Sequence, residues 1–253
     1  MDINSIFNPK SIAVIGASTK VGSVGNDIIK NLATQGYGGK LYPVNPKADE
    51  LYGLKCYANI CEIANEIELA IVIVPAVAVP EVMKEAAKKG VKGAIVISAG
   101  FKEIGNTELE NEVKQICIEN GIALVGPNCL GVLNPKIKMN ASFAIMPPKK
   151  GHVAFISQSG ALVTAILDYA KNLGIGFSKF ISVGNKAMLD ENILLNYLAQ
   201  DKDTKVIAMY AEDLCKAQEI INVAKKITRA KNPKPIIILK SGKTSAGASA
   251  SAS

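Results

Sequence analysis

The feature that most constrains the fold is the alternation of short apolar runs with stretches of helical periodicity along almost the whole chain. In the first half, the apolar runs contain no polar alternation. The runs lie at residues 11–15, 40–44, 69–74, 93–98 and 122–125, and helical patterns lie at 26–35, 80–89 and 107–120. Strands of this kind are buried on both faces, which requires a parallel sheet covered by helices on both sides. The sequence therefore predicts an α/β fold, with a Rossmann-like domain over residues 1–130.

The alternation stops and then resumes, which predicts a second domain. Residues 131–150 contain turn-forming pairs such as Asn134-Pro135 and Pro147-Pro148, and we expect them to form a linker. Strands are expected beyond it at 153–157, 177–183, 206–210 and 235–239, with helices between them. The chain has 253 residues, enough for two α/β domains of roughly 100–150 residues each. We therefore predict a smaller, flavodoxin-like domain over residues 151–253.

The composition excludes several classes of protein. With 49% hydrophobic and 20% charged residues, the chain is expected to form a globular core. Its net charge of +7 comes from lysines mixed with glutamates, as in residues 84–89, and aromatic residues make up only 5%, so no nucleic-acid partner is expected. No apolar run reaches the roughly 18 residues of a membrane span, and the N-terminus does not resemble a signal peptide. These features predict a cytoplasmic protein without a membrane partner.

A metal site is not expected either. His152 is the only histidine, and the cysteines show no Cys-x-x-Cys spacing. The cysteines are Cys56, Cys61, Cys117, Cys129 and Cys215, and we expect reduced, buried thiols.

The turn at residues 16–22 lies where a dinucleotide-binding fingerprint would lie, between a strand and a helix. Its spacing differs from Gly-x-Gly-x-x-Gly, because Ser18 stands where the second glycine would be and the next glycine is Gly22. An NAD site also has an acidic residue at the end of the second strand, whereas this chain has Lys47 there. A lysine suits a phosphate better than a ribose diol, so we expect a phosphorylated ligand other than NAD. A Rossmann-type turn without a ligand is the alternative.

A second candidate site lies in residues 151–162, where a strand ends in a polar turn and a helix begins at Ser159-Gly160. The first N–H groups of such a helix are uncovered, and with the helix dipole they favour an anion. The stretch is not a Gly-x-Ser-x-Gly nucleophile elbow, because Ser157 stands where the first glycine would be. It predicts a phosphate site, with an ordinary serine N-cap as the alternative.

Four ordered motifs resemble those of one family, the nucleoside-diphosphate-forming acyl-CoA synthetases. The motifs are Ser11-Ile-Ala-Val-Ile-Gly-Ala-Ser18, Tyr42-Pro-Val-Asn-Pro-Lys47, Gly126-Pro-Asn-Cys-Leu-Gly131 and Ser157-Gln-Ser-Gly-Ala-Leu162. The family includes ADP-forming acetate–CoA ligase and is related to the α subunit of succinyl-CoA synthetase. The resemblance covers essentially the whole chain. It implies that the first domain binds coenzyme A, and that the second carries phosphate between an acyl phosphate and ADP through a phosphohistidine.

The resemblance also implies roles for individual residues. Coenzyme A would contact a phosphate turn and strand end, formed by Gly16, Ser18, Lys20, Val21 and Lys47, and a pantetheine path, formed by Val74, Pro75, Ser98, Ala99 and Gly100. Ser157, Ser159 and Gly160 would hold the phosphoryl group, and Glu212 would orient the histidine. The alternatives are a buried strand end with a proline stop for Val74 and Pro75, and a solvated acid for Glu212.

One departure from the family pattern concerns the histidine itself. In the family it lies in a loop of small residues that ends in His-Thr-Gly, and this chain contains the beginning of that loop, residues 240–253. His152 opens a strand on the far side of the Ser157 turn and cannot substitute. The chain is therefore expected to be part of a longer synthetase and inactive alone. An ATP-grasp domain or subunit would bind Mg-ADP or Mg-ATP, a small carboxylic acid would be the further substrate, and the full enzyme would be a hetero-oligomer or dimer.

Two functions from different classes fit these features. The first is an enzyme component that converts acyl-CoA, ADP and phosphate into a carboxylic acid, ATP and CoA. The second is a non-catalytic CoA-sensing module of a protein acetyltransferase. A histidine loop followed by an ATP-grasp region beyond residue 253 would favour the enzyme, and an acetyltransferase domain there would favour the sensor. The spacing of the first turn and Lys47 argue against a third possibility, an NAD-dependent oxidoreductase.

Overall fold

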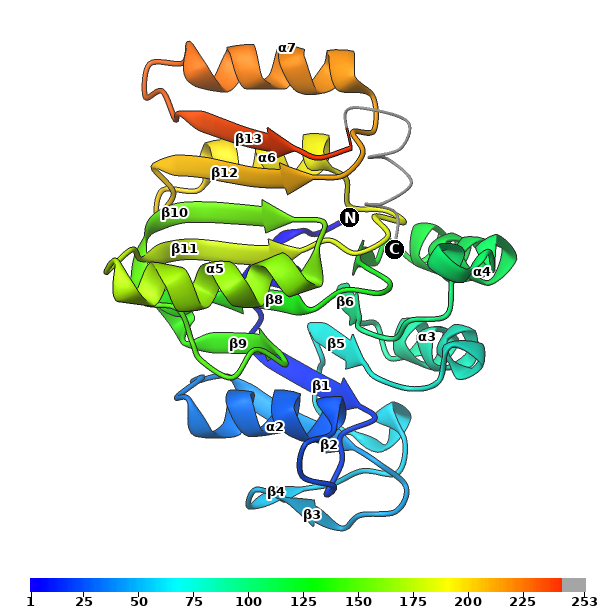
Figure 1. Cartoon of the computed structure of the whole chain (residues 1–253). Coiled ribbons are helices and arrows are strands. Elements are labelled where there is room, and N and C mark those ends of the chain that lie inside the picture. Colours follow the sequence, from blue (N-terminus) through cyan, green and yellow to red (C-terminus); the bar gives the residue numbers. More distant parts are fainter. Residues whose placement is uncertain (243–253) are drawn as a thin grey trace.

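The computed structural model describes residues 1–242 and contains two large sheets with helices packed on them (Figure 1). The first sheet has five parallel strands in the order β2-β1-β5-β6-β7. Its strands are β1 (Ser11–Ile15), β2 (Lys40–Val44), β5 (Leu69–Val72), β6 (Gly93–Val96) and β7 (Ala123–Val125), and its helices are α2 (Val24–Thr34), α3 (Val79–Lys88) and α4 (Thr107–Glu119). The predicted Rossmann-like α/β fold is confirmed.

The residues of β1 show why these strands lack polar alternation. All five residues of the strand are buried. Ile12 and Val14 belong to the core that includes α2, whereas Ala13 and Ile15 belong to the core that includes α3 and α4. Because successive side chains of a strand point to opposite faces, a sheet covered on both sides needs apolar residues at every position.

The second sheet has six strands in the order β13-β12-β10-β11-β8-β9. Its parallel strands are β10 (Lys150–Ser157), β11 (Phe177–Ser182), β12 (Val206–Ala211) and β13 (Ile236–Lys240), and its helices are α5 (Gly160–Asn172), α6 (Glu191–Gln200) and α7 (Ala217–Thr228). Phe155 and Phe180 pack with α5 on one face, and Ile156 and Ile181 share a core with α6 and α7 on the other. The four parallel strands were expected from the sequence.

The segment expected to be a linker, residues 131–150, contains two strands instead. They are β8 (Gly131–Asn134) and β9 (Met139–Ser142), which pair with each other and extend the second sheet antiparallel to β11. Both strands are fully buried, and α2 packs against β9. Residues 143–149 contain no helix or strand. Strands of four residues flanked by proline and asparagine resemble turns in the sequence, and only their burial between the two halves of the molecule identifies them.

Shorter elements complete the described residues. They are α1 (Asn4–Phe7), the hairpin β3 (Glu50–Leu51) and β4 (Leu54–Lys55), and the 3₁₀ helices η1 (Ile60–Glu62), η2 (Ala76–Ala78), η3 (Lys102–Ile104) and η4 (Pro135–Ile137). Within residues 1–242, no helix combines the length and apolar character that a membrane crossing requires. The predicted start of the histidine loop falls largely on residues 243–253, outside the described residues.

Candidate functional site

Each sheet reverses its strand order once, and a cavity of about 1080 Å³ lies at the carboxyl ends of strands from both sheets. In the first sheet the chain places β2 on one side of β1 and β5 on the other, and in the second it places β11 on one side of β10 and β12 on the other. Open α/β sheets bind ligands in the crevice that such a reversal creates at the carboxyl ends of the strands. Ile73 and Val74 follow β5, and Gln158 and Glu212 follow β10 and β12, and all four line the cavity.

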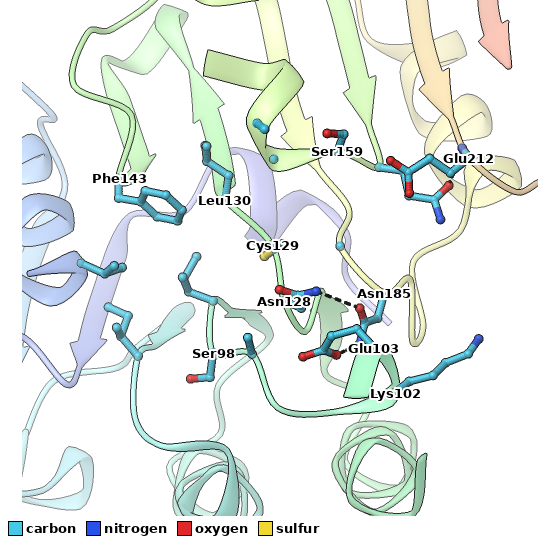
Figure 2. Close-up of a pocket in the computed structure, with 18 of the residues that line it drawn as sticks. Ser98, Lys102, Glu103, Asn128, Cys129, Leu130, Phe143, Ser159, Asn185 and Glu212 are labelled. Carbon is cyan, nitrogen blue, oxygen red and sulfur yellow. Dashed lines mark hydrogen bonds between the residues drawn. The ribbon is translucent and has the colours of Figure 1, made fainter. Parts of the chain in front are cut away.

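The cavity brings together part of the predicted site. The predicted residues that line it are Val74, Ser98, Ala99, Ser159, Gly160 and Glu212. In Figure 2, Ser159 and Glu212 lie on one side of it and Ser98 lies on the other. The predicted residues outside its lining are Gly16, Ser18, Lys20, Val21, Lys47, Pro75, Gly100 and Ser157. Residues from both predicted domains therefore line one cavity, and the turn at residues 16–22 lies outside its lining.

The turn after β1 depends on two glycines. Gly16 has φ +91°, and a Cβ there would lie 2.3 Å from the Ile73 carbonyl oxygen. A Cβ on Gly25, in the first turn of α2, would lie 2.1 Å from the Gly16 carbonyl oxygen. Gly25 thus allows the close approach of helix and strand that the third fingerprint glycine provides in dinucleotide-binding folds. The spacing of Gly16 and Gly22 in the sequence does not reveal this role of Gly25.

Two asparagines hold the same turn against its neighbours. Asn26 donates its side-chain N–H to the Ser18 carbonyl at 2.8 Å, and Asn45 donates to the Ala17 carbonyl at 2.7 Å. The Asn45 side chain also accepts the Lys47 backbone N–H at 2.8 Å, so the loop after β2 lies beside the turn. Lys20 and Lys47 are both exposed. The turn leads directly into the N-terminus of α2, whose dipole favours an anion.

The strand ends of the first sheet form a continuous wall. The Ser98 hydroxyl donates to the Val74 carbonyl at 2.5 Å, and the Asn128 N–H donates to the Ser98 carbonyl at 2.9 Å. Cys129 lines the same wall, where burial raises the pKa of its thiol to about 12. That thiol is therefore protonated at neutral pH and is not a nucleophile.

The loop after β11 joins the two sheets. The N–H groups of Asn185 and Ala187 donate to the carbonyls of Pro127 and Gly126, at 2.9 and 3.1 Å. Gly184 has no room for a side chain, because its Cβ would lie 2.2 Å from the Pro127 carbonyl oxygen. This loop therefore fixes the second sheet against the Gly126–Gly131 motif of the first domain.

A polar network extends from that loop into the first domain. The Asn185 amide donates to the Glu103 carboxylate at 2.6 Å, and the Asn128 amide donates to Asn185 at 3.3 Å (Figure 2). The Asn185 amide also donates to the Glu110 carboxylate at 2.7 Å. At Glu103, hydrogen bonds from Asn185 and from backbone N–H groups outweigh the effect of burial and lower the pKa. The network therefore stabilises negative charge at the edge of the cavity.

The helix start after β10 has the expected form. Ser159 is the N-cap of α5 and accepts the Leu162 N–H at 3.3 Å, as the N-cap alternative predicted. Ser157 is fully buried and donates its hydroxyl to the Ser159 carbonyl at 2.8 Å, so it stabilises the backbone of the turn and does not line the cavity. Gly160 and Ala161 line the cavity, and helix geometry gives their N–H groups no intrahelical acceptor. An anion at this position would meet those donors and the helix dipole.

Gln158 holds the acidic turn opposite that helix start. Its side-chain oxygen accepts the N–H groups of Glu212 and Asp213, at 2.9 and 3.2 Å, and its nitrogen donates to the Asp213 carboxylate. Burial and then the negative charge of Asp213 raise the pKa of Glu212. Hydrogen bonds from Lys186 and Gln158 outweigh burial and lower the pKa of Asp213. Glu212 is thus the acid with the greater affinity for a proton.

Several residues of this site were not predicted from the sequence. Asn128 and Cys129 lie in a motif that was recognised but given no role, and Gln158, Asn185 and Asp213 each follow the end of a parallel strand. Applying the strand-end rule to β11 would have found Asn185. His152 lies at the opposite end of β10 from Ser157, and its Nδ1 lies 2.9 Å from the Asp203 carbonyl oxygen. Among residues 1–242, no cluster of three side chains suited to a metal is present.

Comparison with known proteins follows the same two-part division. A CoA binding domain model matches residues 10–135, and a succinyl-CoA ligase-like flavodoxin domain model matches residues 150–253. The ADP-forming acetate–CoA ligase of Methanocaldococcus jannaschii is 50% identical over 252 residues, which are 100% of this chain and 35% of that protein. The α subunit of ADP-forming acetate–CoA ligase II of Pyrococcus furiosus is 45% identical over 253 residues, covering 99% of this chain and 54% of that subunit.

A solved structure matches equally well. The Candidatus Korarchaeum cryptofilum acetyl-coenzyme A synthetase 1, described as dinucleotide forming and solved with phosphate and ADP, aligns with a TM-score of 0.94 at 42% identity. The match covers 99% of this chain and 54% of that one, so the chain spans about half or less of these relatives. The sequence motifs, the two matched domains and these relatives agree, and the chain belongs to the family of ADP-forming acyl-CoA synthetases, of which it contains the CoA-binding domain and the succinyl-CoA ligase-like flavodoxin domain.

Proposed function

We propose that this chain is the CoA-binding and phosphoryl-transfer portion of an enzyme that converts acyl-CoA, ADP and phosphate into a carboxylic acid, ATP and CoA. The observation that carries the proposal is the cavity that is lined by the strand ends of both sheets. A reaction that moves an acyl group from sulfur to phosphate needs the thioester and the phosphate side by side. Val74 and Ser98 on one wall and Ser159 and Gly160 on the other provide that arrangement.

We assign coenzyme A to the first domain. Its phosphates would meet the turn of Gly16, Ser18, Lys20 and Val21, with Lys47 nearby, and its pantetheine arm would pass Val74, Pro75 and residues 98–100 into the cavity. The close packing at Gly16 and Gly25 and the hydrogen bonds from Asn26 and Asn45 support this, because they hold the turn in one conformation. A preformed turn needs less ordering when the ligand binds.

We assign phosphate to the N-terminus of α5, with Ser159 and Gly160 in contact and Ser157 supporting the turn. Attack of phosphate on the thioester carbonyl would release CoA and form an acyl phosphate. Transfer of its phosphoryl group to a histidine would release the carboxylic acid, and ADP would then accept that group to form ATP. Glu212 would accept a hydrogen bond from one ring nitrogen, which raises the nucleophilicity of the other.

We further propose that the histidine lies beyond Ser253 and that an ATP-grasp domain or subunit binds Mg-ADP. The Pyrococcus furiosus relative is itself a separate α subunit, which supports a partner for this portion. The relatives described above are ligases and a synthetase, which favours the enzyme over the acetyltransferase-linked sensor.

Titration calorimetry with the 253-residue chain tests the CoA assignment. CoA should bind and NAD should not. Lys20→Glu should weaken CoA binding more than tenfold, because it places a negative charge beside a phosphate. Lys30→Glu, on the exposed side of α2, makes the same change of charge away from the turn and should leave the affinity within about twofold. NAD binding without CoA binding, or equal losses in the two variants, would contradict the assignment.

A further inference from the structure

Lys186 lies in the loop between β11 and α6, and its ammonium group is buried among acceptors. Its side chain is 2% exposed. Nζ donates to Glu191 Oε1 at 2.6 Å, to Asp213 Oδ1 at 2.6 Å and to the Asp213 carbonyl oxygen at 3.1 Å. These contacts use all three ammonium protons. The cation therefore joins the start of α6 to the acidic turn in the cavity wall.

The residues before and after Lys186 hold its backbone in one conformation. Lys186 has φ +56°, a left-handed conformation that is costly for a residue with a side chain. Its neighbours Asn185 and Ala187 donate their N–H groups to the first domain. A buried ion pair is also a weak source of stability, because a well-packed apolar group often serves as well. The strained backbone of Lys186 and the burial of its charge therefore favour a role in the candidate functional site over a role in stability.

We propose that Lys186 is a positioning residue that holds the Glu212–Asp213 turn, and with it the Glu212 carboxyl group, in the wall of the phosphate cavity. The inference rests on the proposed function, since it takes Glu212 as the acid that orients the histidine. Gln158 holds the backbone of the same turn. Lys186 adds the connection to the rigid loop between the sheets, which Gln158, at the end of β10, does not provide.

Lys186 also sets the charge around Glu212. The charged groups near Glu212 are Asp213, Lys186 and Lys240, and Lys102 acts on Asp213 from the first domain. Lys186 opposes the effects that raise the pKa of Glu212, and it is the first donor that lowers the pKa of Asp213. Removing its charge should therefore raise the pKa of both acids.

Lys179 provides a matched control. It is a lysine in the same sheet whose side chain is 1% exposed, and it pairs with Asp201 at 3.0 Å. Neither Lys179 nor Asp201 lines the cavity. Lys179→Met and Lys186→Met thus each remove one buried lysine charge, and only Lys186 contacts Asp213 of the acidic turn.

The first measurement follows the Glu212 carboxyl carbon by NMR through a pH titration of the 253-residue chain. Lys186→Met should raise the pKa of Glu212 by about half a unit or more. Lys186→Arg should largely restore it, and Lys179→Met should leave it unchanged. If Lys186→Met does not fold, the double variant Lys186→Met/Glu191→Gln removes the unpaired buried acid and is measured instead. An unchanged pKa of Glu212 in the folded variant would overturn the proposal.

The second measurement is phosphoenzyme formation by the complete reading frame with its ADP-binding partner. Lys186→Met should reduce the rate about tenfold with the KM for CoA unchanged, Lys186→Arg should recover most of the rate, and Lys179→Met should match the wild type. If the wild type labels, Glu212→Gln does not, and Lys186→Met equals Lys179→Met, this inference is wrong and the proposed function stands. If the wild type fails to label, the proposed function fails, and the titration still decides whether Lys186 controls Glu212.

Discussion

Gly25 determines how closely α2 approaches the first sheet, because this residue has no Cβ atom. Replacing a helical glycine by alanine normally stabilises a helix by about 1 kcal/mol. Here the added Cβ would lie 2.1 Å from a backbone oxygen, which no side-chain movement can relieve. The steric effect should therefore exceed the gain in helix propensity.

Gly25→Ala should lower the free energy of unfolding by about 2 kcal/mol and weaken CoA binding, because the turn at residues 16–22 must move. Urea denaturation and calorimetry measure the two effects. Gly38→Ala is the control, since Gly38 is exposed and a Cβ there would meet no atom within 4 Å. Equal denaturation midpoints for Gly25→Ala and the wild type would show that the close approach is not rigid.

At the scale of elements, the structure depends on how α2 packs against β9. Asn31 is 6% exposed, and its amide donates to the carbonyls of Ser142 and Ala144, at 2.8 and 2.9 Å. A helix of the first domain is thereby joined to the hairpin that completes the second sheet. Because β9 ends at Ser142, directly before the cavity residue Phe143 (Figure 2), this contact also sets one wall of the site.

Asn31→Ala should lower the free energy of unfolding by about 2 kcal/mol, because it leaves the buried Ser142 carbonyl without its donor. Thr34→Ala is the control on the same helix, since Thr34 is exposed and should change stability by less than about 0.5 kcal/mol. Chemical denaturation of both variants measures the difference. If the two variants lose equal stability, the contact between α2 and β9 contributes nothing specific.

At the scale of the whole molecule, hydrogen-bonded acids connect stability to pH. Asp201, Asp213 and Glu103 all have a lowered pKa in the folded chain, since hydrogen bonds from Thr204, Lys186 and Asn185 outweigh burial. A lowered folded pKa contributes stability that is present above the unfolded value and is lost as the pH falls through the folded value. Glu212 has a raised pKa, so its contribution has the opposite sign and is lost as the pH rises.

The free energy of unfolding should therefore fall as the pH drops below the ordinary aspartate value of 3.8. Urea denaturation at a series of pH values from about 7 to 3 measures the slope. Asp201→Asn should flatten part of that slope, because it removes one of the acids that must be protonated. A slope identical to that of the wild type would mean that protonation of Asp201 is not linked to folding.

The sequence by itself determined the two α/β units, the order of their parallel strands along the chain and the two turns at Gly16 and Ser159. These features depend on local patterns, since an apolar run or a serine before a helix has nearly the same meaning wherever the segment packs. The candidate site was predictable to the same extent: Val74, Ser98, Ser159 and Glu212 all follow strand ends.

Only the tertiary structure decided which other residues these local elements contact. The strands β8 and β9 acquire their role by being buried between the two halves of the molecule, and Gly25 acquires its role from an oxygen on another element. Lys186 and Gln158 contact Asp213 from 27 and 55 residues away along the chain. Such contacts depend on how rigid elements pack over long separations, and no property of the residue itself records which partner it will face.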